Sequence, residues 1–581
     1  MHAPRRWLAL MALAGFASAC SVTPSATPPL GEHRAIEPKR GGIFRAAMAA
    51  DVRNLDAAVA FDGASHVFLQ FLYDTLVSYD PDGNLVPDLA ERYEVSPDGL
   101  SYTFTLRQNV RFHDGEELTA HDVKRSLERT LHHDTPCPVP SFYNRIRGYE
   151  AFHDGIPGPD GKPTYADELE GVIVEGRYVL RIELKEPDAT FLPVMTLAFA
   201  APVCKSAGST FTREWGNHPC GTGPFELEAW EPGREIRLRR HEGYFRPELP
   251  YLDGITWQLL MPPLTQRFKF ETGELDYLRE MRHSDLVRYL NDPQWKPYAQ
   301  WSFSKSILGI FMNTQMPPFD NVELRRAVAA AIDWDEIAKL REGQLVRATQ
   351  MVPPAVPGHD PTFEGQRFDP EKALQHMKNA GYPFDPKTGK GGLPEVVRYV
   401  GNADGFDTQA AQVIQQRLAK IGIRMTIKIV SWPTFLAITS RRGGAQMGYA
   451  GWSLDYPDPS SFFDPTLSSE AIQEEETQNA AFFVNEELDE LLRKARREMN
   501  PKARAAMYRR AEEIVRDEAP WAIGYGARNL ELVQPYVHGY QVDRTHISDV
   551  RRVWLDVEER NRVTGRRKGQ VEALIRPWGR P

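Results

Sequence analysis

One strand–helix–strand succession restricts the fold of this chain more than any other feature. EVVRYV at 395–400 predicts a strand, DTQAAQVIQQRLAKI at 407–421 predicts a helix, and IRMTIKIV at 423–430 alternates like a second strand. Gly422 supplies a residue at which the helix can end. Because a crossover helix joins parallel strands, this βαβ unit predicts an α/β lobe, which we place at roughly 300–520.

The part of the chain from 55 to 300 also combines strands with helices. After Gly99, LSYTFTLRQNVRFHDG predicts a half-buried strand, and LTAHDVKRSLERTL predicts a helix. Thr119 is the candidate N-cap of that helix, and Asp122, three residues later, is its acidic partner. A chain of 581 residues is too long for one ordinary domain, so we expect two to four lobes of mixed α/β class.

The N-terminus predicts export. Residues 1–19, MHAPRRWLALMALAGFASA, combine basic residues, an apolar run and small residues, as signal peptides do. The next residue completes Ala17-Ser18-Ala19-Cys20, which resembles a lipobox with Ala at the position where Leu is usual. We therefore expect Cys20 to carry lipid and the Pro- and Ser-rich segment 20–41 to link this anchor to an exported body. An ordinary signal peptide followed by an unrelated cysteine is the alternative.

Charge argues against a nucleic-acid partner. The formal net charge of −9 is spread along the chain without a long basic block. The segment 558–581 is basic but short, and we interpret it as a solvated tail.

Three cysteines remain after Cys20. Cys204 and Cys220 flank a short loop and are the natural candidates for a disulfide in an exported protein, which would leave Cys137 unpaired. The sequence leaves the other pairings open. None of the three has the CxxC spacing of a zinc or redox site.

Sequence signatures of common enzymes are missing. The chain contains no G-x-S-x-G and no H-E-x-x-H, and neither GTGPFE nor GPDGKP completes a nucleotide-binding loop. His132, His133 and Asp134 are potential metal ligands, but we expect adjacent side chains to point apart, and no second cluster has ligand spacing. We therefore expect no cofactor, no metal and no enzyme activity.

The segment GWSLDYPDPSSFF, residues 451–463, is too rich in proline for a regular helix or strand. Its acids could form an acid/base pair, yet no nucleophile lies nearby in the sequence. A purely structural loop, with Asp458 capping a turn, is one reading. The other is a rigid receptor for an ammonium group, made of a carboxylate beside an indole ring.

Four blocks of sequence resemble the extracellular solute-binding proteins of family 5, the peptide and dipeptide receptors of ABC importers. They are residues 73–128, 221–245, 311–333 and 451–463, and they occur in the same order as in that family. The resemblance extends over about 42–555, nearly the whole body that would follow export.

This resemblance implies a two-lobed periplasmic-binding-protein fold of α/β class, with an extra subdomain inserted in lobe I. Lobe I would consist of 42–54, 200–299 and 525–557. The inserted subdomain would be 55–199, and lobe II would be 300–524. The lobes would close around a ligand held in the cleft between them.

The resemblance also implies ligand contacts. In peptide-binding members, an acid at the position of Asp455 holds the free α-amino group of the ligand. The other residues that the resemblance places at the ligand are Gly451, Trp452, Ser453, Tyr525 and either Phe142 or Tyr143.

One position departs from the pattern of some peptide receptors. They place an arginine for the ligand carboxylate three residues before the Trp, where this chain has Tyr449. Arg441 or Arg442 could substitute, although solvated surface is the simpler reading of RRGGAQ. What anchors a peptide carboxylate is therefore open.

The function implied is that of a monomeric, lipid-anchored receptor that captures peptides in the periplasm or at the outer face of the membrane. It would deliver them to a permease and its ATPase. The same fold also serves metal chelates, haem and sugars, so these remain alternatives. An exported sensor or chaperone, and a hydrolase that uses the acids of 455–464, are further alternatives.

Overall fold

The computed structural model describes residues 37–158, 161–341, 343–403, 405–474, 477–542 and 550–565. The predicted signal peptide, Cys20 and most of the predicted linker lie outside the described residues. The chain separates into two units, Met1–Pro38 and Lys39–Pro581, and the fold below is that of the second.

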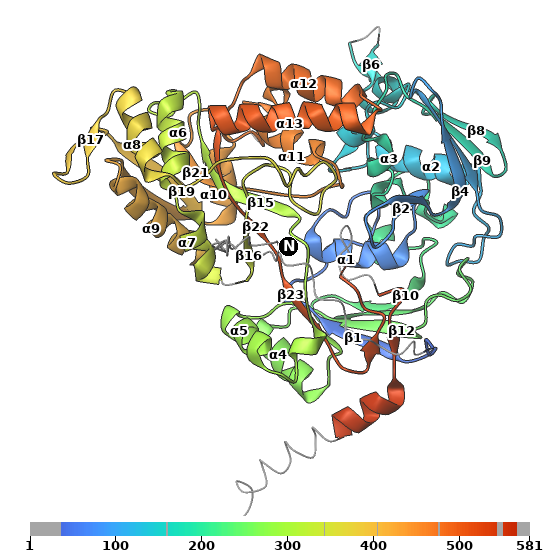
Figure 1. Ribbon diagram of the computed structural model, residues 1–581. Coiled ribbons are helices and arrows are strands. Elements are labelled where there is room, and N and C mark those ends of the chain that lie inside the picture. The colour runs from blue at the N-terminus through green and yellow to red at the C-terminus, as the bar shows by residue number, and fades with distance from the viewer. Residues whose placement is uncertain are drawn as a thin grey trace, which may run out of the picture. The chain divides into compact units, whose positions relative to one another are not determined.

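A six-stranded sheet forms the centre of lobe II (Figure 1). In sheet order its strands are β16 (Leu345–Arg347), β22 (Trp521–Ala527), β15 (Ser306–Met312), β21 (Met447–Ser453), β19 (Val396–Asn402) and β20 (Arg424–Val430). Strands β19 and β20 are parallel, with α9 (Gly405–Ala419) between them in the chain. The predicted βαβ unit is therefore confirmed.

Helices cover both faces of this sheet. One core contains side chains of α6 (Val322–Ala331), α7 (Trp334–Ala338), α8 (Pro370–Asn379) and α9. The other contains side chains of α10 (Trp432–Thr439), α11 (Ser460–Leu467), α12 (Glu486–Arg497) and α13 (Pro501–Glu518). Along β15, Ile310 and Met312 enter the first core, whereas Ile307 and Phe311 enter the second, because successive strand residues point to opposite faces.

Lobe I contains two smaller sheets. One consists of β1 (Ile43–Ala47), β12 (Gly254–Gln258), β11 (Glu235–Arg240) and β10 (Phe225–Glu231). The other consists of β13 (Tyr277–Leu278), β23 (Leu530–Val533) and β14 (Ala299–Trp301). The helices of this lobe are α1 (Gly63–Leu72), α4 (Pro263–Thr272) and α5 (His283–Asn291). The chain passes between the lobes twice, from β14 to β15 and from β22 to β23.

The inserted subdomain has a core of its own. Its sheet consists of β4 (Ala90–Val95), β5 (Ser101–Leu106), β9 (Val179–Glu183) and β8 (Val172–Gly176), joined in the same core by α2 (Ala120–Leu131) and α3 (Phe191–Val194). The strand predicted after Gly99 is β5. The predicted capping box of α2 is present, because the Asp122 carboxylate accepts a hydrogen bond from the Thr119 N–H at 3.0 Å.

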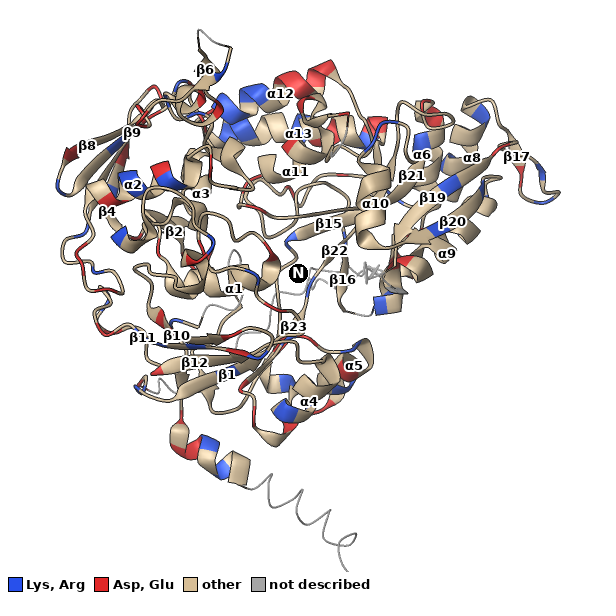
Figure 2. Ribbon diagram, turned by 180° about the vertical axis from the view of Figure 1, so that it is seen from behind, with Lys and Arg blue, Asp and Glu red and all other residues tan. Residues whose placement is uncertain are grey.

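Four two-stranded sheets complete the described strands. They are β2 (Val77–Tyr79) with β3 (Leu85–Pro87), β6 (Ile156–Pro157) with β7 (Pro163–Thr164), β17 (Phe384–Asp385) with β18 (Lys390–Gly391), and β24 (Val537–His538) with β25 (Trp554–Leu555). No helix among the described residues has both the length and the apolar character needed to cross a membrane. Acidic residues lie in the first turn of α12 and basic residues in its last turn (Figure 2).

Three expected boundaries differ from the structure. Helix α1 packs in the core of lobe I, so the inserted subdomain begins after Tyr73 and not at 55. Strand β14 pairs with β23, so lobe I extends to Trp301. Tyr525 lies in β22, so lobe II extends to Ala527, and residues 558–565 of the expected tail belong to a helix that begins at 557. All three differences have the same cause. The boundaries follow strand pairing and core packing, and neither can be read from a block of sequence.

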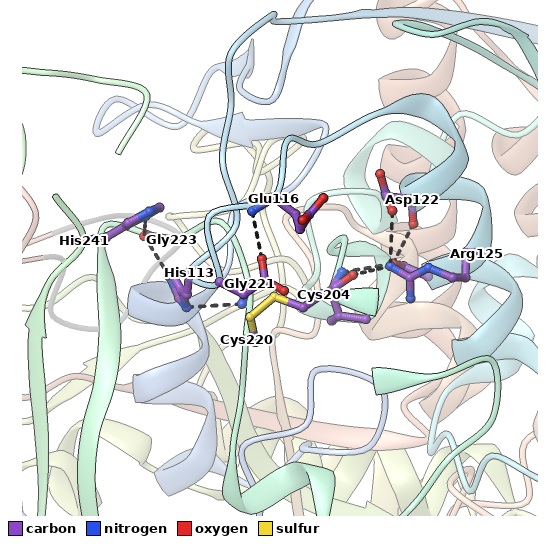
Figure 3. Close-up of a disulfide and its surroundings, with 12 residues drawn as sticks. His113, Glu116, Asp122, Arg125, Cys204, Cys220, Gly221, Gly223 and His241 are labelled. Carbon is purple, nitrogen blue, oxygen red and sulfur yellow. Dashed lines mark hydrogen bonds and ion pairs between the residues drawn. A yellow bond between two sulfur atoms is a disulfide. The ribbon is translucent and has the colours of Figure 1, made fainter. Parts of the chain in front are cut away.

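A disulfide joins Cys204 to Cys220, with 5.5 Å between their Cα atoms (Figure 3). Cys204 belongs to the subdomain core, and Cys220 contacts both that core and the core of lobe I. Cys137 is not bonded to another cysteine. Beside the disulfide, the Gly221 N–H donates to Nδ1 of His113 at 3.2 Å, and Nε2 of His113 donates to the Gly223 carbonyl at 3.1 Å.

Candidate ligand-binding cleft

The proline-rich segment 451–463 was expected to form neither strand nor helix, but residues 451–453 end β21 and residues 460–463 begin α11, so only 454–459 connect the two. Two acids in this part of the chain are structural. Asp458 accepts hydrogen bonds from the N–H of Ser460 at 2.9 Å and from an Arg504 nitrogen at 2.7 Å. Asp464, in α11, pairs with Arg496. Both carboxylates therefore have a cation beside them, as buried carboxylates usually do. The turn-capping role expected for Asp458 fits these contacts.

Asp455 differs from both of them. Its carboxylate accepts a hydrogen bond from the Ser461 hydroxyl at 3.3 Å, and no lysine or arginine of the described residues pairs with it. Burial raises the pKa of Asp455 to about 6, against the opposing effects of Ser461 and of Trp452, whose N–H lies nearby without a hydrogen bond of normal geometry. A half-buried carboxylate in this state gains from any cation that enters the site.

Two cavities meet at Asp455. The first, of about 570 Å³, lies between residues 138–145 and 186–194 of the inserted subdomain and residues 452–497 of lobe II, and we call it the subdomain cavity. The second, of about 600 Å³, includes residues 302–306 and 527–531, where the chain passes between lobes, and we call it the hinge cavity. Phe61, Phe142 and Asp455 line both of them.

Four of the seven expected ligand residues lie at these cavities. Asp455 and Phe142 line both, Trp452 lines the subdomain cavity, and Ser453 lines the hinge cavity. Phe142 packs edge-on against Tyr456, with ring centroids 5.2 Å apart. Tyr456 itself is buried in the subdomain core, although it lies in the segment that connects two lobe II elements.

The other three expected residues line neither cavity. Tyr143 is buried in the subdomain core, where its hydroxyl donates to the Val194 carbonyl at 3.1 Å. Tyr525 is buried in lobe II and packs edge-on against Trp334. Each ring faces the core side of its backbone, so neither lies at these two cavities, and their contact with a ligand stays a prediction. Of the pair Phe142 and Tyr143, the structure thus places only the first at the cleft.

Gly451 serves close packing. It pairs with Leu308 across β21 and β15, and a Cβ atom at this position would lie 2.7 Å from the Leu308 side chain. That separation is shorter than real contacts between carbon atoms, so the end of the Leu308 side chain would have to shift to admit a larger residue here.

The expected substitutes for a carboxylate anchor lie elsewhere. Tyr449 is in β21 and packs edge-on against Phe435, with ring centroids 6.3 Å apart. Arg442 pairs with Glu474 at 3.5 Å and lies over the ring of Phe482. Neither Arg442 nor Arg441 lines the two cavities.

Sequence reasoning missed the charged residues of the hinge cavity. They are the cationic Arg279, Lys305 and Arg551 and the acidic Asp74, Asp88 and Glu531. Burial raises the pKa of Asp74 to about 7, although the Tyr244 hydroxyl donates to its carboxylate at 3.1 Å. These residues come from segments far apart in the chain, so no local motif could have revealed them.

The possible metal ligands His132, His133 and Asp134 correct another expectation. Their ligand atoms lie within 4.8 Å of one another, so the side chains do not point apart. The two imidazole rings stack, with centroids 4.2 Å apart, and Nδ1 of His132 accepts a hydrogen bond from the Asp134 N–H. None of the three lines either cavity.

Comparison with known proteins agrees with this geometry. The family model for bacterial extracellular solute-binding proteins, family 5 middle, matches residues 84–474. The chain belongs to this family. The family consists of binding proteins, and its two-lobed α/β fold is the fold of this chain. The match covers three of the four blocks that suggested the family in full, namely 221–245, 311–333 and 451–463, and residues 84–128 of the first block.

Individual members of family 5 are similar over most of the chain. The glutathione-binding protein GsiB of Salmonella typhi is 28% identical over 480 residues, which cover 82% of this chain and 87% of that protein. The periplasmic binding protein DppA of Helicobacter pylori, solved with the peptide STSA, is 27% identical, with a TM-score of 0.68 and coverage of 89% and 99%. HbpA2 of Haemophilus parasuis shows the same fold at 24% identity, with a TM-score of 0.75 and coverage of 89% and 100%.

Proposed function

We propose that this family 5 protein captures short peptides in the cleft at Asp455 and delivers them to the permease and ATPase of an ABC importer. The relatives support this proposal, because one is named as a glutathione-binding protein and another was solved with a tetrapeptide. Family membership supports binding without turnover, since the family consists of binding proteins.

The observation that carries the proposal is the state of Asp455. It is the one acid of the trio Asp455, Asp458 and Asp464 that has no cationic partner in the described chain, and it lies where two cavities meet. A peptide brings an α-ammonium group, which supplies the missing cation. The neighbouring indole of Trp452 and ring of Phe142 offer apolar surface to the rest of the ligand.

The location belongs to the same proposal. A signal peptide at 1–19 and a lipid on Cys20 would hold the receptor at the membrane, in the periplasm or at the outer face of the cell. Metabolic labelling with a palmitate analogue tests this, since the wild-type protein should carry label and Cys20→Ala should not. Label on both proteins, or on neither, would contradict lipidation at Cys20.

Native mass spectrometry of protein purified without refolding tests the choice of ligand. We expect bound masses that differ by amino-acid residues, and these masses should disappear from Asp455→Ala. A single bound mass that is not a peptide would contradict peptide capture and favour a chelate, haem or sugar receptor on the same fold.

A further inference from the structure

The hinge cavity contains one arginine whose hydrogen-bonding capacity is largely unused. Arg279 directly follows β13, and its side chain is 30% exposed. Its Nε lies 3.7 Å from a carboxylate oxygen of Glu531, which is an ion-pair distance but too long for a hydrogen bond. The described residues offer no hydrogen-bond acceptor to its two terminal nitrogens. Guanidinium groups in proteins otherwise find planar acceptors, so this one is available to a ligand.

Glu531 does not depend on Arg279. The hydroxyl of Tyr277 donates to Glu531 at 2.9 Å, and the hydroxyl of Tyr540 donates to the same carboxylate oxygen. The Glu531 side chain is only 5% exposed, so these two phenols stabilise it inside the protein. The role of Arg279 is therefore not explained by its one acidic neighbour.

The hinge cavity has further positive charge besides that of Arg279. Lys305 and Arg551 add two further positive charges to its wall, from the first lobe connection and from the segment before β25. The acids Asp74 and Asp88 on the same wall already have partners, in Tyr244 and Arg246 respectively. Asp455 lies at the junction with the subdomain cavity, and its carboxylate attracts a cation there.

We infer that Arg279 binds the carboxylate of the same ligand whose amine is held by Asp455. This inference rests on the proposed function and specifies its substrate class, which is short zwitterionic peptides. Both residues line one cavity of about 600 Å³, within the range of about 300–1,000 Å³ that is usual for sites of small molecules. A long peptide would carry its carboxylate beyond such a site, because each extended residue adds about 3.3–3.6 Å.

The test is calorimetric titration with tri-alanine and with tri-alanine amide, which lacks the carboxylate. Wild-type protein should bind the amide roughly 10- to 100-fold more weakly than the acid, the effect of losing hydrogen bonds between charged groups. Arg279→Gln should lower the affinity for the acid by a similar factor and leave the affinity for the amide unchanged. Arg279→Lys should recover part of the affinity for the acid.

Arg282→Gln is the matched control. It lies three residues further along the same segment, and its Nε pairs with Asp285 at 3.1 Å instead of lining either cavity. It should bind both probes as the wild type does. Urea unfolding of each variant checks that the fold is retained, and the comparison of acid with amide on wild-type protein needs no variant.

The outcomes separate this inference from the proposed function. Equal affinity of wild-type protein for acid and amide overturns the role of Arg279 and leaves peptide capture intact. Equal weakening of acid and amide by Arg279→Gln also overturns it, because Arg279 would then act through the structure of the wall. If tri-alanine, the peptide STSA and glutathione all fail to bind, the proposed function and this inference both fall.

Discussion

Replacement of Asp455 by asparagine gives the sharpest test of the cleft, because it should affect binding and folding in opposite directions. At pH 7 the carboxylate, with a pKa of about 6, is mostly ionised in the empty protein. The asparagine side chain has nearly the same shape but cannot form an ion pair. Truncation of one partner of a buried charged pair costs about 2–5 kcal/mol, and the half-buried position and retained amide oxygen favour the lower end. We therefore expect tri-alanine to bind about 30- to 150-fold more weakly, which corresponds to about 2–3 kcal/mol.

The same substitution, Asp455→Asn, should make the ligand-free protein more stable. The folded protein binds a proton at Asp455 more tightly than the unfolded chain does, because burial raises the pKa from 3.8 to about 6. The contribution of this group to the free energy of unfolding therefore falls as pH rises between those values and stays low above them. At pH 7 asparagine removes a penalty of up to about 3 kcal/mol, since one pH unit corresponds to about 1.4 kcal/mol.

Calorimetric titration and urea unfolding at pH 7 measure the two effects. Glu490→Gln is the control, because this carboxylate is exposed on α12 and pairs with Arg493 and Lys494. N-acetylated tri-alanine, which lacks the ammonium group, should bind wild type and Asp455→Asn equally. Unchanged affinity of Asp455→Asn for free tri-alanine would refute the reasoning, since no amine would then lie at this carboxylate.

Four further predictions follow from the same contacts. Affinity for tri-alanine should fall as pH drops below about 6, by up to tenfold per unit, because protonated Asp455 cannot pair with an amine; a flat calorimetric profile from pH 7 to 5 would contradict this. Trp452→Ala should lower the affinity for tri-alanine several-fold in the same assay. Unchanged affinity would show that the indole only packs against the core of lobe II. Burial lowers the pKa of His113 to about 3 in the folded protein. As pH drops from 6.5 towards 3, His113 is therefore protonated in the unfolded chain but not in the folded protein. The free energy of unfolding measured in urea should fall over this range by up to about 1.4 kcal/mol per pH unit. His113→Gln should make that slope shallower, and an equal slope would rule His113 out as its source. Replacement of Cys204 and Cys220 together by serine should lower the free energy of unfolding by about 3 kcal/mol, because their sequence separation of 16 closes a short loop, and no change in urea unfolding would show that the bond does not form.

Local patterns predicted local structure well. The βαβ unit around α9 and the capping box of α2 depend on residues close together in the chain, where periodicity and hydrogen-bonding groups are visible in the sequence. The resemblance of segment 451–463 to a block of family 5 also directed attention to Asp455, which lines both cavities, and its contact with a ligand stays a prediction. The lack of a cation beside Asp455 was not predictable, since that depends on where Arg496 and Arg504 pack.

Features that depend on distant segments were missed or misplaced. Tyr143 and Tyr525 were expected at the ligand, but a single backbone position decides whether an aromatic ring faces a core or a cleft. Helix α1 was assigned to the inserted subdomain, although its apolar residues pack in lobe I. Arg279 lies in LREMR, a segment with no motif. The cavity beside it forms only because Glu531 and the lobe connections fold against this segment.

The position of Tyr456 has a mechanical consequence for the receptor. This residue directly follows Asp455 in a segment between two elements of lobe II, yet its ring is 5% exposed within the core of the inserted subdomain. Separating the walls of the subdomain cavity would withdraw that ring into water, at a cost of about 1.5–3 kcal/mol for an aromatic side chain. The resting receptor therefore resists separation of these two walls.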